Sequence, residues 1–408
     1  MNRNEGLLTT TPSNCSALVV LYVRATSRAE PQTQKIPSQF WVLMRRSPLV
    51  VLPPGLRREN SEAAEGTYVA RSRAPLRLGL AGGGSDVSPY CDTYGGAVLN
   101  ATIDRYATAT FESRADGKIL FASQDLDRTE ELALAAALPI TEGLVLHRGV
   151  YNRMIRDFNG GTALAMTLTT HVESPIGSGL GSSSALVVAM VQLFAQVLRA
   201  PLGEYEVARL AFDIERVDLG FAGGRQDQYA AAFGGFNFLE ISANEQVIVN
   251  PLRIKPHIVW ELEASLLLVF TGASRDSSNI ISSQTQTVSA GGKSLEAMHA
   301  LKAEAVAMKE ALLFGRIREM AAILKRGWEA KKATSSAVSN SAIEKLMEDA
   351  MRAGALAGKV SGAGGGGFIM FLVEPSRKLN VVKCLVKAGF DPASPRFTAE
   401  GSVAWEPK

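Results

Sequence analysis

The stretch "PIGSGLGSSSALV" at residues 175–187 places three glycines at alternating positions, then three serines, then apolar residues. Glycine lets a backbone approach a ligand closely and turn its N–H groups inward. A helix that begins at the serines would add unpaired N–H groups and the positive end of its dipole. Together these features predict an anion site, most naturally one for phosphate. The alternative is a flexible turn ahead of a buried helix.

Three known glycine motifs do not fit this stretch. The dinucleotide-binding pattern GxGxxG needs a glycine where Ser182 stands, and the Walker A pattern needs a lysine, which is absent between His171 and Arg199. The GxSxG turn of a nucleophilic serine is absent as well. The sequence therefore predicts a phosphate loop without its own lysine, so the neutralising charge must come from a metal ion and from elsewhere in the chain.

Carboxylates that could hold a metal ion follow in the next segment. A helix predicted over 204–220 carries Asp213, Glu215 and Asp218, and a glycine-flanked loop carries Asp227. The alternative for the helix carboxylates is an ordinary solvated helix face. Asp227 is followed by the apolar "YAAAFGG", which predicts burial, and a buried carboxylate needs a partner or a function.

The composition is typical of a soluble globular protein long enough for two domains, with 408 residues, 46% hydrophobic and 20% charged. Three widely spaced cysteines predict free thiols in a reducing cytoplasm, and the four histidines show no zinc-ligand spacing. No apolar run reaches the roughly 18 residues that a membrane span needs. We therefore expect a cytoplasmic protein that does not bind membranes.

The net charge of +3 comes from the N-terminal segment, because residues 1–67 hold eight basic and five acidic residues. The remainder is neutral, so we expect no nucleic-acid partner. The same segment holds six of the 17 prolines and little periodicity. We expect residues 1–67 to be disordered, or to lie upstream of the native start, and the folded part to begin near residue 68.

Hydrophobic patterning predicts the elements of an α+β chain. The expected helices lie at 149–158, 183–198, 204–220 and 376–388, with three more after a polar loop over 275–293. The expected strands lie at 68–81, 96–113, 118–123, 162–172, 264–272, after the glycines near 367, and around "GSVAW" at the C-terminal end. "ADG" at 115–117 predicts a hairpin turn between two of these strands. We expect domains over 68–255 and 256–408.

Three segments together resemble one family. "RAPLRLGLAGGGSD" (73–86), "PIGSGLGSSSA" (175–185) and "KVSGAGGGG" (359–367) are similar to the signature motifs of the GHMP small-molecule kinases. The resemblance covers residues 68–408. It implies a two-domain fold, with a ribosomal protein S5 domain 2-like N-terminal domain and a ferredoxin-like C-terminal domain.

Within this superfamily, "GGRQDQYAAAFGGFNFLE" and "VIVNPLRIK" resemble the branch that phosphorylates the anomeric hydroxyl of D-glycero-D-manno-heptose 7-phosphate for polysaccharide biosynthesis. The resemblance implies ATP and Mg²⁺, a 1,7-bisphosphate product, and a monomer or homodimer. One alternative is a sugar-1-kinase of the fucose or galactose type. Another is a regulator that binds sugar and ATP without catalysis.

The resemblance also implies a role for individual residues. Asp227 would accept the proton of the attacking hydroxyl, Arg77 would keep Asp227 ionised and stabilise the transferring phosphoryl group, and Ser183 with Glu215 would hold Mg²⁺. The residues implied to bind ATP are Pro175, Gly177, Ser178, Gly179, Leu180, Gly181, Ser182 and Ser183. Those implied to bind the sugar or shape its cleft are Gly83, Gly84, Asp86, Gly362 and Gly364. The candidates for the 7-phosphate are Arg73, Arg225 and Lys359.

Overall fold

The computed structural model describes residues 67–408 except 176 and 273–276. The prediction of a disordered or spurious N-terminal segment therefore lies, apart from Thr67, outside the described residues. Within the described part, no helix combines the length and the apolar character that crossing a bilayer requires.

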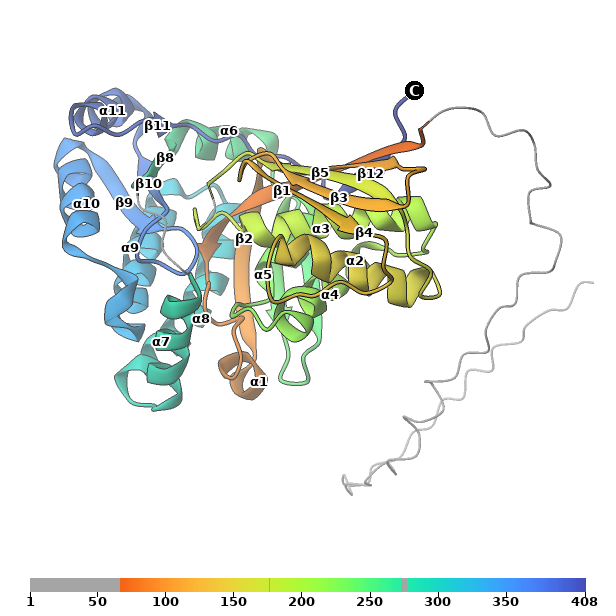
Figure 1. Ribbon diagram of the computed structural model, residues 1–408. Coiled ribbons are helices and arrows are strands. Elements are labelled where there is room, and N and C mark those ends of the chain that lie inside the picture. The colour runs from red at the N-terminus through yellow and green to blue at the C-terminus, as the bar shows by residue number, and fades with distance from the viewer. Residues whose placement is uncertain (1–66, 176, 273–276) are drawn as a thin grey trace, which may run out of the picture. The chain divides into compact units, whose positions relative to one another are not determined.

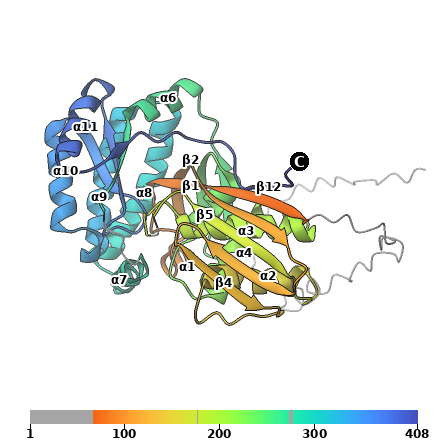
Figure 2. The same ribbon diagram turned by 45° about the horizontal axis from the view of Figure 1, so that its top comes forward.

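The larger of two sheets contains eight strands, in the order β12-β1-β2-β5-β3-β4, with β6 and β7 continuing from β2. The strands are β1 (Val69–Ala81), β2 (Gly96–Ser113), β3 (Lys118–Ser123), β4 (Arg128–Ala133), β5 (Met166–Val172), β6 (Phe236–Ile241), β7 (Val247–Pro251) and β12 (Val403–Trp405). The long strand β2 pairs with β6 along its first part and with β5 along its last part. The C-terminal strand β12 returns to the edge of this sheet beside β1 (Figure 2).

The hairpin predicted at 115–117 is wrong. Strand β5 lies between β2 and β3, antiparallel to the first and parallel to the second. The residues at 115–117 favour a turn, but they do not indicate which strands pair on either side of it. Strand β5, which separates β2 from β3, comes from much later in the chain. The actual hairpin partner of β3 is β4, whose exposed and polar sequence "RTEELA" gave no strand signal.

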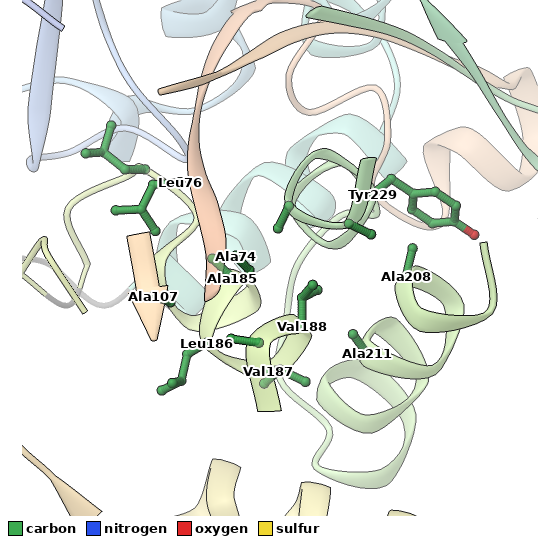
Figure 3. Close-up of a cluster of buried hydrophobic side chains, with 14 of the residues drawn as sticks. Ala74, Leu76, Ala107, Ala185, Leu186, Val187, Val188, Ala208, Ala211 and Tyr229 are labelled. Atoms are coloured by element: carbon green, nitrogen blue, oxygen red, sulfur yellow. The ribbon is translucent and has the colours of Figure 1, made fainter. Parts of the chain in front are cut away.

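Helices pack on the large sheet around α3, most of whose residues are buried. The helices of this part are α1 (Tyr90–Tyr94), α2 (Val145–Phe158), α3 (Ser182–Leu198), α4 (Glu204–Phe212) and α5 (Gln226–Phe233). Helix α3 contacts β1, β2, α2, α4 and α5. Figure 3 shows Ala185, Val187 and Val188 of α3 in one buried cluster with Ala74 of β1 and Ala211 of α4. Small side chains allow this close packing, which fixes where α3 begins.

The second sheet is antiparallel, with strand order β11-β8-β10-β9. Its strands are β8 (Leu266–Phe270), β9 (Ala355–Val360), β10 (Phe368–Val373) and β11 (Pro392–Ala393). The accompanying helices are α6 (Pro256–Ser265), α7 (Ser277–Ser289), α8 (Lys293–Leu313), α9 (Ile317–Thr334), α10 (Ser341–Ala353) and α11 (Lys378–Lys387). Figure 1 shows these elements at one side and the large sheet at the other. The α+β class is confirmed, and the boundary expected at residue 255 stays a prediction.

Two helical segments differ from the sequence prediction. Residues 277–289, expected as a polar loop, form α7, whose Ile280 and Val288 are buried. This segment is rich in Ser, Thr and Gln, and its few apolar residues are not enough to show a helical period. The helix expected over 204–220 is α-helical only to Phe212 and continues as a π-helix over Asp213–Asp218. A π-helix shifts the faces of the residues that follow it and is frequent at functional sites.

The second and third glycine motifs touch each other. A Cβ added to Gly179 would lie 2.4 Å from the carbonyl oxygen of Ser361, and one added to Gly367 would lie 2.4 Å from that of Ser178. The Ser361 hydroxyl donates to the Gly179 carbonyl at 2.8 Å, and the Phe368 N–H donates to the Ser178 carbonyl at 2.8 Å. Backbone therefore lies against backbone here, which only glycine allows.

We expect Gly179→Ala to destabilise the protein more than Gly117→Ala. Both glycines have left-handed φ angles, +80° and +70°, but a Cβ on Gly117 would meet nothing within 4 Å. The control should lose about 1 kcal/mol from backbone strain alone. Gly179→Ala should lose at least about 2 kcal/mol more, because its methyl group would overlap backbone atoms. Equal free energies of unfolding for the two variants, measured in urea, would contradict the contact.

Candidate active site

A cavity of about 480 Å³ brings together all three motifs that the sequence singled out. Its wall includes most of the candidate site residues: Arg77, Gly84, Asp86, Gly177, Ser178, Gly179, Gly181, Ser182, Ser183, Asp227 and Gly362. Segments separated by more than half of the folded chain therefore meet in one place.

Five candidates do not line this cavity: Pro175, Leu180, Gly83, Gly364 and Glu215. Leu180 is fully buried in the core, and its carbonyl accepts the N–H of Arg77 at 3.0 Å. Gly364 packs against another loop, because a Cβ there would lie 2.7 Å from the Val338 carbonyl oxygen. The positions of Leu180 and Gly364 therefore indicate support of the loops rather than contact with a ligand.

Arg77 and Asp227 form an ion pair in the cavity wall. The Arg77 Nε donates to Asp227 Oδ1 at 2.7 Å, and its Nη2 lies 2.6 Å from the same oxygen. The Nη1 of Arg77 donates to the Gly179 carbonyl at 2.6 Å. The pairing of β1 with β2 is irregular on both sides of Arg77, which frees its backbone N–H for Leu180. The second Asp227 oxygen, Oδ2, faces Gly181, where an added Cβ would lie 3.4 Å from it.

Asp86 fixes the segment that carries Asp227. Its carboxylate is 1% exposed and accepts the Gln226 backbone N–H at 3.0 Å, the Gln226 side-chain amide at 3.2 Å and the Gly84 N–H at 3.1 Å. Both oxygens of Asp86 are therefore engaged within the protein. The structure gives Asp86 a positioning role beside the sugar-binding role expected from the sequence.

The N-terminus of α3 faces the cavity without a capping side chain. Its N-cap, Gly181, is left-handed and makes no side-chain cap hydrogen bond. The first intrahelical bond runs from the Ala185 N–H to the Gly181 carbonyl at 2.9 Å, so the N–H groups of the serines before it point out of the helix. These donors and the dipole of a 17-residue helix favour an anion.

Glu215 differs from its acidic neighbours on the π-helix. It is completely buried, and its Oε2 accepts the Gln228 amide at 2.6 Å. Its Oε1 has no hydrogen-bond partner among the described residues, and the nearest cation, Arg216 Nη1, is 3.7 Å away. A buried, underused carboxylate oxygen next to the start of α3 fits a cation ligand. Asp213 and Asp218 instead pair with Arg209 and Arg153, so the solvated-face alternative holds for them.

None of the three cations proposed for a second phosphate lines the cavity. Arg73 pairs with Glu400 at 2.6 Å and lies over the Tyr106 ring. Arg225 is buried against Ser88, Cys91 and Phe212, and Lys359 donates to the Gly79 carbonyl at 2.9 Å. These side chains are occupied in holding strands and loops together.

Two other cations, Lys331 and Arg216, do line the cavity. Burial lowers the pKa of Lys331 to about 8, although the charges of Asp86 and Asp227 act in the opposite direction. Burial, with the charges of Lys331 and Arg77, lowers the pKa of Lys359 to about 7. Burial thus lowers the pKa of Lys331, which lines the cavity, and of Lys359, which does not, toward neutral pH.

Sequence reasoning missed Lys331 and Arg216 for understandable reasons. Lys331 and Lys332 lie in the last turn of α9, where basic residues normally complement the helix dipole. Arg216 looked like an exposed residue of an amphipathic helix, because the π-helical turn was not foreseen. A single sequence offers no signal that separates Lys331, which is buried, from Lys332, which pairs with Glu329 and Glu344 on the surface.

Comparison with known proteins identifies relatives over nearly the whole described part. Residues 145–235 match the GHMP kinases N terminal domain, and residues 305–391 match the GHMP kinases C terminal domain. A D-glycero-alpha-D-manno-heptose 7-phosphate kinase of Campylobacter jejuni is 48% identical over 335 residues, which are 82% of this chain and 98% of the relative.

Solved structures agree in fold. The crystal structure of a D-glycero-D-manno-heptose 1-phosphate kinase from Bacteroides thetaiotaomicron has a TM-score of 0.72 and 45% identity, covering 83% of this chain and 99% of that one. The mevalonate kinase of Methanococcus jannaschii, at 18% identity and a TM-score of 0.65, covers 82% of this chain and 99% of that one. The latter likeness shows the fold alone.

The buried lysine behind the cavity predicts a pH-dependent effect of mutation on stability. In the unfolded chain lysine stays protonated to about pH 10, whereas in the folded protein the pKa of Lys359 is about 7. Between these values the folded state binds fewer protons, so stability rises with pH. Lys359→Met removes this titration, so the free energy of unfolding of the variant minus that of wild type should be more positive at pH 6 than at pH 9.

The matched control for this measurement is Lys332→Met. The pKa of Lys332 is raised by its carboxylate partners, despite an opposing effect of partial burial, so its charge does not change in this range. A relative stability of Lys359→Met that is the same at both pH values in urea unfolding would contradict the lowered pKa.

Proposed function

We propose that this chain phosphorylates the anomeric hydroxyl of D-glycero-D-manno-heptose 7-phosphate to give the 1,7-bisphosphate and ADP. The chain belongs to the GHMP kinase family of ATP-dependent phosphotransferases. The similarity to a heptose 7-phosphate kinase at 48% identity supports the substrate. The observation that carries the chemistry is the Arg77–Asp227 pair beside the uncapped start of α3.

The nucleotide phosphates are proposed to bind at the glycine-serine loop. The serine N–H groups at the start of α3 supply donors, and the left-handed glycines Gly177, Gly179 and Gly181 let the loop curl around phosphate oxygens. Arg216 lines the same wall and donates to Ser184 at 3.4 Å, so it can add positive charge there. This arrangement supplies the neutralising charge that the loop itself lacks.

Asp227 is proposed to take the proton of the anomeric hydroxyl. Arg77 occupies Oδ1, which leaves Oδ2, on the Gly181 side, to accept that proton. The anomeric oxygen then forms its bond to the γ-phosphorus while the bond from that phosphorus to the β,γ-bridging oxygen breaks, and ADP carries away the electron pair. The transfer needs positioning and charge stabilisation more than covalent chemistry from the protein.

Mg²⁺ is proposed to bind between Ser183 and Glu215. Ser183 lines the cavity with an exposed side chain, and Glu215 offers the buried oxygen Oε1. One carboxylate and one hydroxyl suit a metal that keeps water and phosphate oxygens as its other ligands. When bound, the ion would neutralise charge on the nucleotide phosphates.

The acceptor is proposed to be a sugar that already carries a phosphate. Three cationic side chains, Arg77, Arg216 and Lys331, line the cavity beside two acidic ones, Asp86 and Asp227. The names of the two heptose kinase relatives place the existing phosphate at different carbons, 7 and 1. The 7-phosphate leaves the anomeric hydroxyl free for the reaction proposed here.

The test of this function is ADP release by the purified protein with Mg²⁺ and ATP. The acceptors are D-glycero-D-manno-heptose 7-phosphate, D-glycero-D-manno-heptose 1-phosphate, mannose 6-phosphate, galactose, fucose and no sugar. We expect release with heptose 7-phosphate and little with the others. Preference for galactose or fucose would make the protein a different sugar-1-kinase, and no release with any sugar would favour a regulator that binds without catalysis.

We expect Asp227→Asn to lower kcat by about 10²- to 10⁴-fold, because the amide cannot accept the proton. ATP affinity, measured by calorimetry, should change little, since the nucleotide contacts lie on α3 and its loop. Asp213→Asn is the control, because Asp213 pairs with Arg209 away from the cavity wall. A kcat of Asp227→Asn within a few fold of wild type would refute the role of this carboxylate.

A further inference from the structure

Among the three cationic side chains that line the cavity, Lys331 is the one to which the proposed reaction assigns no contact of its own. It comes from the last turn of α9, is 4% exposed and lines the cavity. Its Nζ donates to the carbonyl oxygen of Gly362, a residue of the third glycine motif. An ammonium group has three N–H donors, so this contact leaves two available.

The charge of Lys331 lacks a direct partner within the described residues. Its only hydrogen-bond acceptor there is a neutral carbonyl, while Asp86 and Asp227 act on it from a greater distance. A buried charge is costly unless it is paired. The unused donors of Lys331 therefore point to an anion that enters the cavity with a substrate.

The elements around Lys331 identify which substrate that is. Thr334, one turn away on α9, accepts a hydrogen bond from Gln284 of α7 at 3.0 Å, and Gln284 lines the cavity too. Val87 and Gly84 line both the cavity and a small neighbouring pocket against α7. These residues belong to other elements than the uncapped N-terminus of α3, where Arg216 contacts Ser184.

We propose that Lys331 binds the phosphate group that the sugar acceptor already carries, and so selects phosphorylated over unphosphorylated sugars. The proposal rests on the proposed function and adds the residue that sets its acceptor specificity. The wall of α7, α9 and residues 84–87 holds the acceptor, and the start of α3 holds the nucleotide. Arg77 and Asp227 lie between the two groups to be joined.

The charges around Lys331 predict a pH dependence. Burial lowers the pKa of Lys331 to about 8. The negative charges of Asp86 and Asp227 oppose this shift, and the positive charges of Arg77 and Lys359 also lie near Lys331. Sugar phosphates are dianions above about pH 6. The KM for the phosphorylated acceptor should therefore rise as the pH increases through 8 and Lys331 loses its proton.

The experiment compares wild type, Lys331→Met, Lys331→Arg and Lys332→Met in the ADP-release assay with heptose 7-phosphate. We expect Lys331→Met to raise the KM for the sugar phosphate by about 10- to 100-fold, the effect of losing one charged hydrogen bond. The KM for ATP should stay within about twofold. Lys332→Met, which removes a partly exposed neighbour on the same helix that does not line the cavity, should match wild type.

Lys331→Arg guards against a variant that fails to fold, because it keeps the charge. We expect Lys331→Arg to bind the acceptor better than Lys331→Met does. Because arginine stays protonated, the KM for the acceptor should begin to rise at a higher pH in Lys331→Arg than in wild type. An unchanged KM for the acceptor in Lys331→Met, or an equal rise for ATP, would overturn the assignment while leaving the proposed function intact. A wild-type enzyme that uses only unphosphorylated sugars would overturn both.

Discussion

The ion pair between the buried Arg77 and Asp227, which is partly exposed and not buried as its sequence context predicted, is the contact on which the site depends. It joins strand β1 to helix α5, and the Arg77 guanidinium also holds the Gly179 carbonyl of the phosphate loop. Arg77 is 4% exposed, so loss of the Asp227 carboxylate would leave a buried charge unpaired. The pair therefore fixes the geometry of three segments and, through Oδ1, determines which Asp227 oxygen is available for chemistry.

The close contact between the second and third glycine motifs fixes the position of the cavity wall that holds Lys331. Gly179 lies against Ser361 and Gly362, and the Gly362 carbonyl in turn holds Lys331. A displacement of the third motif would therefore move both the phosphate loop and the lysine of the opposite wall. Nucleotide and acceptor sites are linked here through backbone contacts that only glycine permits.

The sequence predicted the parts of the fold that local patterns control. The bounds of β2 and α3 and the phosphate loop followed from β-propensity, apolar runs and glycine spacing. What depends on distant partners was not predictable: β5 inserting between β2 and β3, and α7 with its few apolar residues. The same reason explains Lys331, whose burial results from the meeting of two chain segments and not from its neighbours in sequence.

The most direct test of this account is a crystal structure with a non-hydrolysable ATP analogue and heptose 7-phosphate bound together. We expect the γ-phosphate at the N–H groups that begin α3, the anomeric oxygen within about 3 Å of Asp227 Oδ2, and the sugar phosphate on Lys331. A sugar whose anomeric oxygen lies away from Asp227, or a γ-phosphate held elsewhere, would contradict it.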